Sequence, residues 1–355
     1  MNKNNGKLLA AVIAMLMVVC AFAVVAMPSS DAAYITEAGT DLSEDKTVAN
    51  TEAFAALGGT SGIINVTTDV TITLGENIGS PDAPVKVAFI LGGSLTIKSA
   101  EGQNYSLYIE TDMTTVKNGS NNYSSVVYFK ADDLSFNVEN ANVYLDNATD
   151  NNRTNSIFNS QYGTTGGYTA TVSVKNADLT LSQTGTIVSG GSGSTWIAAT
   201  GEGKVSNLKL ENADLVCNGT AAFMDTVITT TGTANTIVMN DVEVGLVAAT
   251  GSNIANLTYT VNGANLQGLA FKGTVTTDNS TFEVNDANRD NNASRAGVIL
   301  YTGSAVTMDD DSKISADTVK VAEDWNGDIK EGTTGAVMPT VTGGTIDGAT
   351  FLAST

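Results

Sequence analysis

The sequence predicts an all-β solenoid, a rod in which short strands stack as successive coils. Three observations support this prediction: a ten-residue pattern recurs along the chain, each half of it alternates between apolar and polar residues, and most copies have asparagine at the centre. Alternation with a period of two is typical of strands that bury one face. The stretches are rich in Val, Thr and Asn and lack a 3.6-residue period, which argues against helices.

The clearest copies of the pattern are spaced 36 residues apart. They read "FNVENANVYL" from Phe136, "VSVKNADLTL" from Val172 and "LKLENADLVC" from Leu208. Looser copies, with Gly or Asn at the centre, begin at Tyr259, Val275 and Pro339. A repeat held in register with its apolar sites indicates a repeated structural unit.

The central residues Asn140, Asn176 and Asn212 predict a ladder of sharp bends, because asparagine tolerates the left-handed backbone region. Two strands joined by one bend cannot enclose a core, but stacked copies can, at about 4.8 Å per layer. Counting degenerate copies, the sequence predicts roughly nine coils, with insertions as loops on one flank.

Residues 1–33 have the features of a secretory signal peptide. Two lysines precede an apolar run from Leu8 to Ala26, and small residues offer cleavage near Ala26 or Ala32. An uncleaved anchor is the alternative, since the run could just span a bilayer. We expect residues 34–50 to form a linker and residues 51–355 the solenoid domain. The expected location is extracellular or at the cell surface, with no membrane span once the signal is removed.

The two ends of the solenoid carry different sequences. The segment "NTEAFAALGG" at 50–59 has helix start and stop signals and predicts a short N-terminal capping helix. Such a cap would cover strand edges that otherwise recruit other chains. The C-terminal segment offers no comparable helix. It therefore ends either in a closing loop or in an interface for self-association through coil ends.

The "NADL" coils, the opening "ALGGTSGIINVTTDVTITL" and the "GGSLTIKSAEG" that follows resemble right-handed parallel β-helix proteins. The resemblance covers about residues 50–355 and is to the adhesin-like and pectate-lyase-like surface proteins exported by archaea and bacteria. It implies a right-handed parallel β-helix, with inward asparagines stacked at one bend, matched by Asn140, Asn176 and Asn212. It also implies an adhesin-like binding and structural protein that displays loops toward a glycan or another cell's surface. The alternatives are a polysaccharide lyase or hydrolase of this fold and a self-assembling filament or surface-layer subunit.

Composition excludes some function classes. The net charge is −20, from 37 acidic and 17 basic residues, and there is no histidine. A binder of nucleic-acid phosphates needs a basic stripe, so we expect no nucleic-acid partner. Outside the predicted signal peptide the only cysteine is Cys217. No intramolecular disulfide is then available, and this thiol is expected to be a small buried apolar group.

The sequence names no catalytic residue. Enzymes of the resembled family use a Lys or Arg base with Ca²⁺, or clustered aspartates with a histidine, and the chain has three arginines and no histidine. Whether it is an enzyme stays open. Asp286, Asn288 and Asp290 alternate like oxygen ligands of a hard cation and predict a structural Ca²⁺; a solvated loop is the alternative. No other cofactor is expected.

Aromatic side chains offer a route to carbohydrate. Tyr144 is expected at an outward strand position, and Tyr162 and Trp196 lie in or beside predicted loops. These three residues predict glycan contacts, with ordinary scattered surface aromatics as the alternative. Asp178 and Asp214 follow the bend in neighbouring coils, where they would bind a cation or face water.

Overall fold

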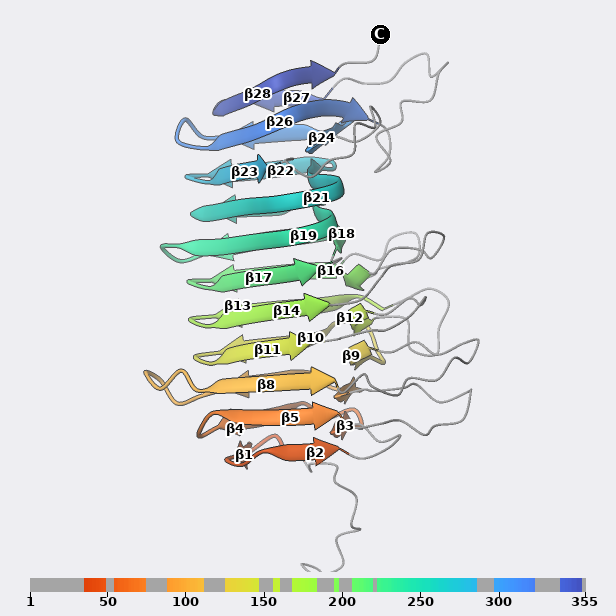
Figure 1. Cartoon of the computed structure of the whole chain (residues 1–355), viewed down its shortest axis with the longest axis vertical. Helices are drawn as coiled ribbons and strands as arrows, with labels where there is room; N and C mark the ends of the chain where they lie inside the picture. Colours follow the sequence, from red (N-terminus) through yellow and green to blue (C-terminus); the bar gives the residue numbers. More distant parts are fainter. Residues whose placement is uncertain are drawn as a thin grey trace, which may run out of the picture.

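The structure, a computed structural model, is a stack of short parallel strands (Figure 1). It describes residues 35–48, 54–74, 88–111, 125–146, 156–159, 168–183, 195–197, 206–219, 222–285, 297–322 and 339–352. Every regular element within these ranges is a β-strand. The strands wind as a right-handed parallel β-helix with three faces. The fold class predicted from the sequence is confirmed.

Each coil contributes one strand to each face. Face A consists of β1 (Thr40–Leu42), β4 (Gly62–Val66), β7 (Leu95–Lys98), β10 (Leu134–Glu139), β13 (Ala170–Lys175), β16 (Ser206–Glu211), the second part of β18 (Ala222–Thr231), β20 (Ser252–Ala255), β22 (Thr274–Asp278), β25 (Ala305–Met308) and β27 (Thr340–Thr342). After a short bend the chain enters face B, which consists of β2 (Lys46–Val48), β5 (Val70–Leu74), β8 (Ser106–Thr111), β11 (Asn142–Asp146), β14 (Asp178–Gln183), β17 (Asp214–Gly219) and the first parts of later strands. Those later strands are β19 (Asn235–Ala248), β21 (Leu257–Phe271), β23 (Thr281–Asn285), β26 (Lys313–Ala322) and β28 (Thr345–Leu352).

The third face closes the coil. Face C consists of β3 (Ala55–Leu57), β6 (Phe89–Leu91), β9 (Ser125–Phe129), β12 (Ser156–Asn159), β15 (Thr195–Ile197), β24 (Val298–Tyr301), the start of β18 and the ends of β19, β21, β26 and β28. Faces A and B each hold eleven strands in the described residues, against the roughly nine coils predicted. Most gaps in the described residues fall between a face B strand and the next face C strand.

The predicted 36-residue repeat sets the register of these layers, because strands 36 residues apart pair with each other. Phe136 pairs with Val172, and Val172 with Leu208, on face A. On face B the same offset aligns β11 with β14 and β14 with β17. Val174 and Leu210 are direct neighbours, and both are almost fully buried. Because every layer is parallel and in register, apolar side chains stack on apolar side chains along the rod.

The bend between faces A and B is built by left-handed residues. Asn140, Asn176 and Asn212 have φ of 52°, 47° and 48°. Further along the rod Asn256 and Asn279 take the same conformation, with φ of 52° and 45°. A single residue in this region turns the chain so that both flanking strands still point inward.

The asparagine side chains at the bend do not point inward, contrary to what the resemblance implied. Asn176 and Asn212 are exposed, and Nδ2 of Asn212 donates to Oδ1 of Asn176 at 3.3 Å on the surface. The buried position is the next residue, Ala141, Ala177 or Ala213. Alanine thus places a small apolar side chain on the inner side of the corner.

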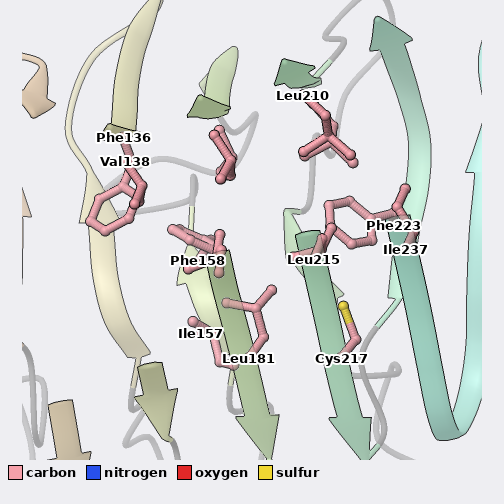
Figure 2. Close-up of a cluster of buried hydrophobic side chains, with 14 of the residues drawn as sticks. Phe136, Val138, Ile157, Phe158, Leu181, Leu210, Leu215, Cys217, Phe223 and Ile237 are labelled. Atoms are coloured by element: carbon pink, nitrogen blue, oxygen red, sulfur yellow. The ribbon is translucent and has the colours of Figure 1, made fainter. Parts of the chain in front are cut away.

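The core runs the length of the rod between the three faces. Figure 2 shows its middle part, where side chains from faces A, B and C meet. Phe158 on face C packs edge-on against Phe136 on face A, with ring centroids 5.3 Å apart. Cys217 is fully buried in this cluster, and burial raises the pKa of its thiol far above the usual range. A buried protonated thiol behaves as a small apolar group.

The N-terminal capping helix is not present in the described residues. The described part of that segment, from Phe54, leads into strand β3, which pairs with β6. Phe54, Ala55 and Leu57 are buried and Ala56 is exposed, so the Ala-rich run supplies the inward residues of face C. Strands β1 and β2 lie in residues 34–50, the predicted linker, and form a layer below β4 and β5. No helix of the described chain is long and apolar enough to cross a bilayer.

Candidate functional site

The outward side of face B carries a pair of stacked tyrosines. Tyr108 on β8 and Tyr144 on β11 are in register, with ring centroids 4.5 Å apart and planes 9° from parallel. The centroid distance is close to the spacing of the layers, so the rings stack along the rod. Both side chains are partly exposed. The second face of the Tyr144 ring is therefore turned toward the next layer, where Thr180 is the register partner.

Carboxylates flank the tyrosine pair on both sides. Two residues before Tyr144 the outward row runs from Asn142 to Asp178 and Asp214. Asp146 lies two residues after Tyr144, and its pKa is raised by burial and, in addition, by the nearby negative charge of Glu110. We call Tyr108, Tyr144, Asp146, Asp178 and Thr180 the tyrosine face. The outward positions of β8, β11, β14 and β17 hold no basic residue.

This arrangement perturbs the titration of its members. Partial burial raises the pKa of Asp178, and the charge of Asp214 in the next layer raises it further. Burial likewise raises the pKa of Tyr144, with added contributions from Tyr108 and Asp178. Negative charges at this spacing repel one another, which favours a ligand that donates hydrogen bonds or carries positive charge.

Asp146 is the most constrained carboxylate of the tyrosine face. Burial raises its pKa, and the charge of Glu110 adds to the effect. Its Oδ1 atom is inaccessible to solvent and has no hydrogen-bond partner among the described residues. A buried acceptor without a donor is costly, which agrees with the raised pKa of this carboxyl group.

A cleft of about 600 Å³ lies at the A–B bend of the first layers, next to the tyrosine face. We call it the bend cleft; its lining residues are Asp41, Asn65, Val66, Thr67, Lys98, Ser99, Ala100, Glu101, Gln103, Tyr105, Glu139 and Asn140. One wall is the loop 99–105, which is longer than the bends of the layers on either side. Tyr105 packs partly against the core.

Hydrogen bonds fix this loop in place. The backbone N–H of Tyr105 donates to Oγ of the buried Ser99 at 3.2 Å, and Ser99 N–H donates to the carbonyl of Glu139 at 3.2 Å. The side chain of Asn142 donates to the carbonyl of Asn104 at 3.3 Å. The wall of the bend cleft is thus formed before any ligand arrives, as in most binding sites.

A row of alternating charges on face A leads into the bend cleft. Lys98, Glu139, Lys175 and Glu211 are successive register partners. Lys175 and Glu211 form an ion pair at 3.0 Å. Lys98 and Glu139 form no ion pair with another described residue, although they are neighbours in register. The two unpaired charges of this row line the cleft.

The other predicted site residues lie elsewhere or outside the described residues. Tyr162 and the proposed calcium ligands Asp286, Asn288 and Asp290 are outside them. Trp196 is in β15, but its side chain is not described. Among the described residues no group of three or more Cys, Asp or Glu side chains converges as a metal-binding set.

Sequence reasoning singled out Tyr144 but missed its partner and the bend cleft. Tyr108 precedes Tyr144 by 36 residues, the offset of the clear repeats, but the loop 99–105 lengthens the A–B bend of its layer, so the face A strand before it is offset by 41 residues and the layer does not read as a copy of the pattern. The register of β8 with β11 is the signal that joins them. The bend cleft combines residues from four layers and has no linear motif.

Comparison with known proteins assigns the chain to no family. No protein-family model matches the chain, and no curated protein or solved structure matches it significantly. The fold and the surface features therefore define the class on their own: an all-β parallel solenoid with an aromatic and acidic outer face.

Proposed function

We propose that the protein is an exported, adhesin-like rod at the cell surface that binds glycans through the tyrosine face. The observation that carries the proposal is the stacked pair Tyr108–Tyr144 on an outward sheet face. Aromatic rings bind the apolar face of a pyranose, and neighbouring carboxylates accept hydrogen bonds from its hydroxyl groups. The secretory signal predicted in residues 1–33 supports export.

The geometry supports a defined binding step. A sugar ring resting on Thr180 would lie against the free face of Tyr144, with Asp178 on one side and Asp146 on the other. The rigid stack holds these groups without a cost for ordering them, which favours affinity. A long parallel solenoid also displays such a surface away from the cell.

The test is glycan-array binding by the secreted protein and by Tyr144→Ala. We expect the variant to lose at least tenfold in affinity, because the stacking wall is removed. Thr229→Ala, an outward threonine on face A, is the matched control and should bind normally. Unchanged binding by Tyr144→Ala would reject the role of the tyrosine face. Labelling of intact cells with antibody tests the location; protein found only inside cells would reject the surface role.

A second candidate is end-to-end self-assembly. Within the described chain, β27 and β28 pair only with β25 and β26, and the inward residues Val341 and Ile346 are only partly buried. An edge of this kind can accept a strand of a second copy. Sedimentation at high concentration should then show oligomers that Val341→Lys abolishes. Monomers alone would exclude this candidate.

A further inference from the structure

The bend cleft has the chemistry of a saccharide subsite. Its polar lining residues include the planar amide and carboxylate groups of Asn65, Gln103, Glu101 and Glu139, beside the ring of Tyr105. Such side chains match the paired hydroxyl groups of a sugar, which both donate and accept. A cleft of about 600 Å³ is within the size range of small-ligand sites.

The charges in the cleft select the type of sugar. The charged lining residues are Asp41, Glu101 and Glu139 and a single cation, Lys98. A lining with three carboxylates and one ammonium group repels a polyanion, whereas carboxylates accept hydrogen bonds from neutral hydroxyl groups. Lys98 itself is available to donate, since it forms no ion pair with another described residue.

The cleft adjoins the tyrosine face. Asn140 at the bend and Tyr144 in β11 are four residues apart, at most about 13 Å at the rise of a strand. Tyr105 and Tyr108 are separated by about 10 Å on the same basis. A single pyranose cannot reach both places, but a short chain of linked sugars can.

We propose that the bend cleft is a second subsite of the glycan-binding surface, and that the ligand is a neutral oligosaccharide spanning the cleft and the tyrosine face. The inference rests on the proposed glycan-binding function and deepens it by naming the ligand class. Asp41, Glu101 and Glu139 would accept from sugar hydroxyls, Lys98 would donate to a ring or hydroxyl oxygen, and Tyr105 would border the sugar face.

Isothermal titration of the mature protein tests the proposal. The probes are dimers and hexamers of β-1,4-linked glucose and of N-acetylglucosamine, with a galacturonic acid hexamer as the anionic comparison. We expect one neutral hexamer to bind at least tenfold more tightly than its dimer and than the anionic hexamer. The single variants Lys98→Met and Gln103→Ala should weaken hexamer binding about tenfold and leave dimer binding unchanged. Both positions are at the surface, and the thermal midpoint checks their folding.

The outcomes separate the two proposals. Wild-type hexamer affinity in both cleft variants, together with a loss in Tyr144→Ala, would overturn the cleft inference and leave the tyrosine face intact. Loss in the cleft variants with normal binding by Tyr144→Ala would support sugar binding in the cleft but overturn the tyrosine face and the spanning ligand. Preference for the galacturonic acid hexamer would overturn the argument from charge. Absence of binding to every hexamer would overturn both proposals.

Discussion

The side-chain amide of Asn212 donates a hydrogen bond to Oδ1 of Asn176 at 3.3 Å, across two successive bends of the solenoid. Both residues have positive φ, so each supplies a backbone turn and a side-chain link between layers. The same device recurs where Nδ2 of Asn279 donates to Oδ1 of Asn256 at 2.7 Å. Asparagine is suited to this place because it tolerates the left-handed region and carries both a donor and an acceptor.

Variants at Asn176 separate the contribution of the left-handed backbone turn from that of the side-chain hydrogen bond. Asn176→Ala keeps a small side chain but is strained at φ of 47°, and we expect it to cost about 1–2 kcal/mol of unfolding free energy. Asn176→Gly relieves the strain and loses only the exposed hydrogen bond, so it should cost less than the alanine variant. Urea unfolding measures both. Equal losses would show that backbone strain is not what selects asparagine here.

The ion pair between Lys175 and Glu211 closes one end of the charge row on face A. Lys175→Glu would place three carboxylates in successive layers, with Glu139 below and Glu211 above. We expect a loss of about 1 kcal/mol at low salt, and a smaller loss for Lys175→Met, which only removes the pair. Both side chains of the pair are roughly half exposed, so 1 M salt should remove most of the difference between the variants. A difference that persists in 1 M salt would point to packing instead.

The sequence predicted the repeating layer because its physical cause is local. An inward apolar residue at every second position and a left-handed residue between two strands are both visible in "VSVKNADLTL". Where successive coils contain the same number of residues, as from Phe136 to Leu208, the offset is constant and the register follows. Tyr144 could be placed on the outside for the same reason.

The prediction failed where alternation alone had to show which residue forms the bend between two strands. The looser copy from Tyr259 set its bend at Gly263, but the bend is at Asn256, and Tyr259 pairs with Ile237 on face B. Gly263 does have positive φ, yet it lies inside β21, which continues through the corner into face C. Period two cannot tell which strand of a coil a segment forms. The short strands of face C, such as β3, are too brief to show any period.

Asp178 should make stability depend on pH. Its pKa is raised in the folded state, mainly by burial and then by Asp214, so the native state holds the proton more tightly than the unfolded chain. The contribution of Asp178 to stability is therefore largest below the unfolded pKa of about 4 and is lost as the pH rises through the folded pKa. Asp178→Asn mimics the protonated form. We expect it to stabilise the protein at pH 7 by about 0.5 kcal/mol, a small value because solvent screens a partly exposed group.

Thermal unfolding between pH 3 and pH 8 checks this expectation. The curves of wild type and Asp178→Asn should meet below about pH 4, where the wild-type side chain is protonated in both states. Asp178→Glu is the matched control, because it retains the charge and should show no gain at pH 7. A gain of equal size at every pH would contradict an electrostatic origin.

Gly245 marks a place where two layers approach too closely for a side chain. A Cβ atom there would lie 2.0 Å from the carbonyl oxygen of Gly268 and 2.7 Å from the hydroxyl of Tyr259. That hydroxyl is fully buried, donates to the same carbonyl and accepts from Leu246 N–H at 3.2 Å. Gly245→Ala must move this bonded corner, and we expect it to cost at least about 1–3 kcal/mol. Gly58→Ala, which meets no atom within 4 Å, should be nearly neutral. Comparison of their urea midpoints measures the difference, and equal midpoints would mean that the corner between faces B and C yields without cost.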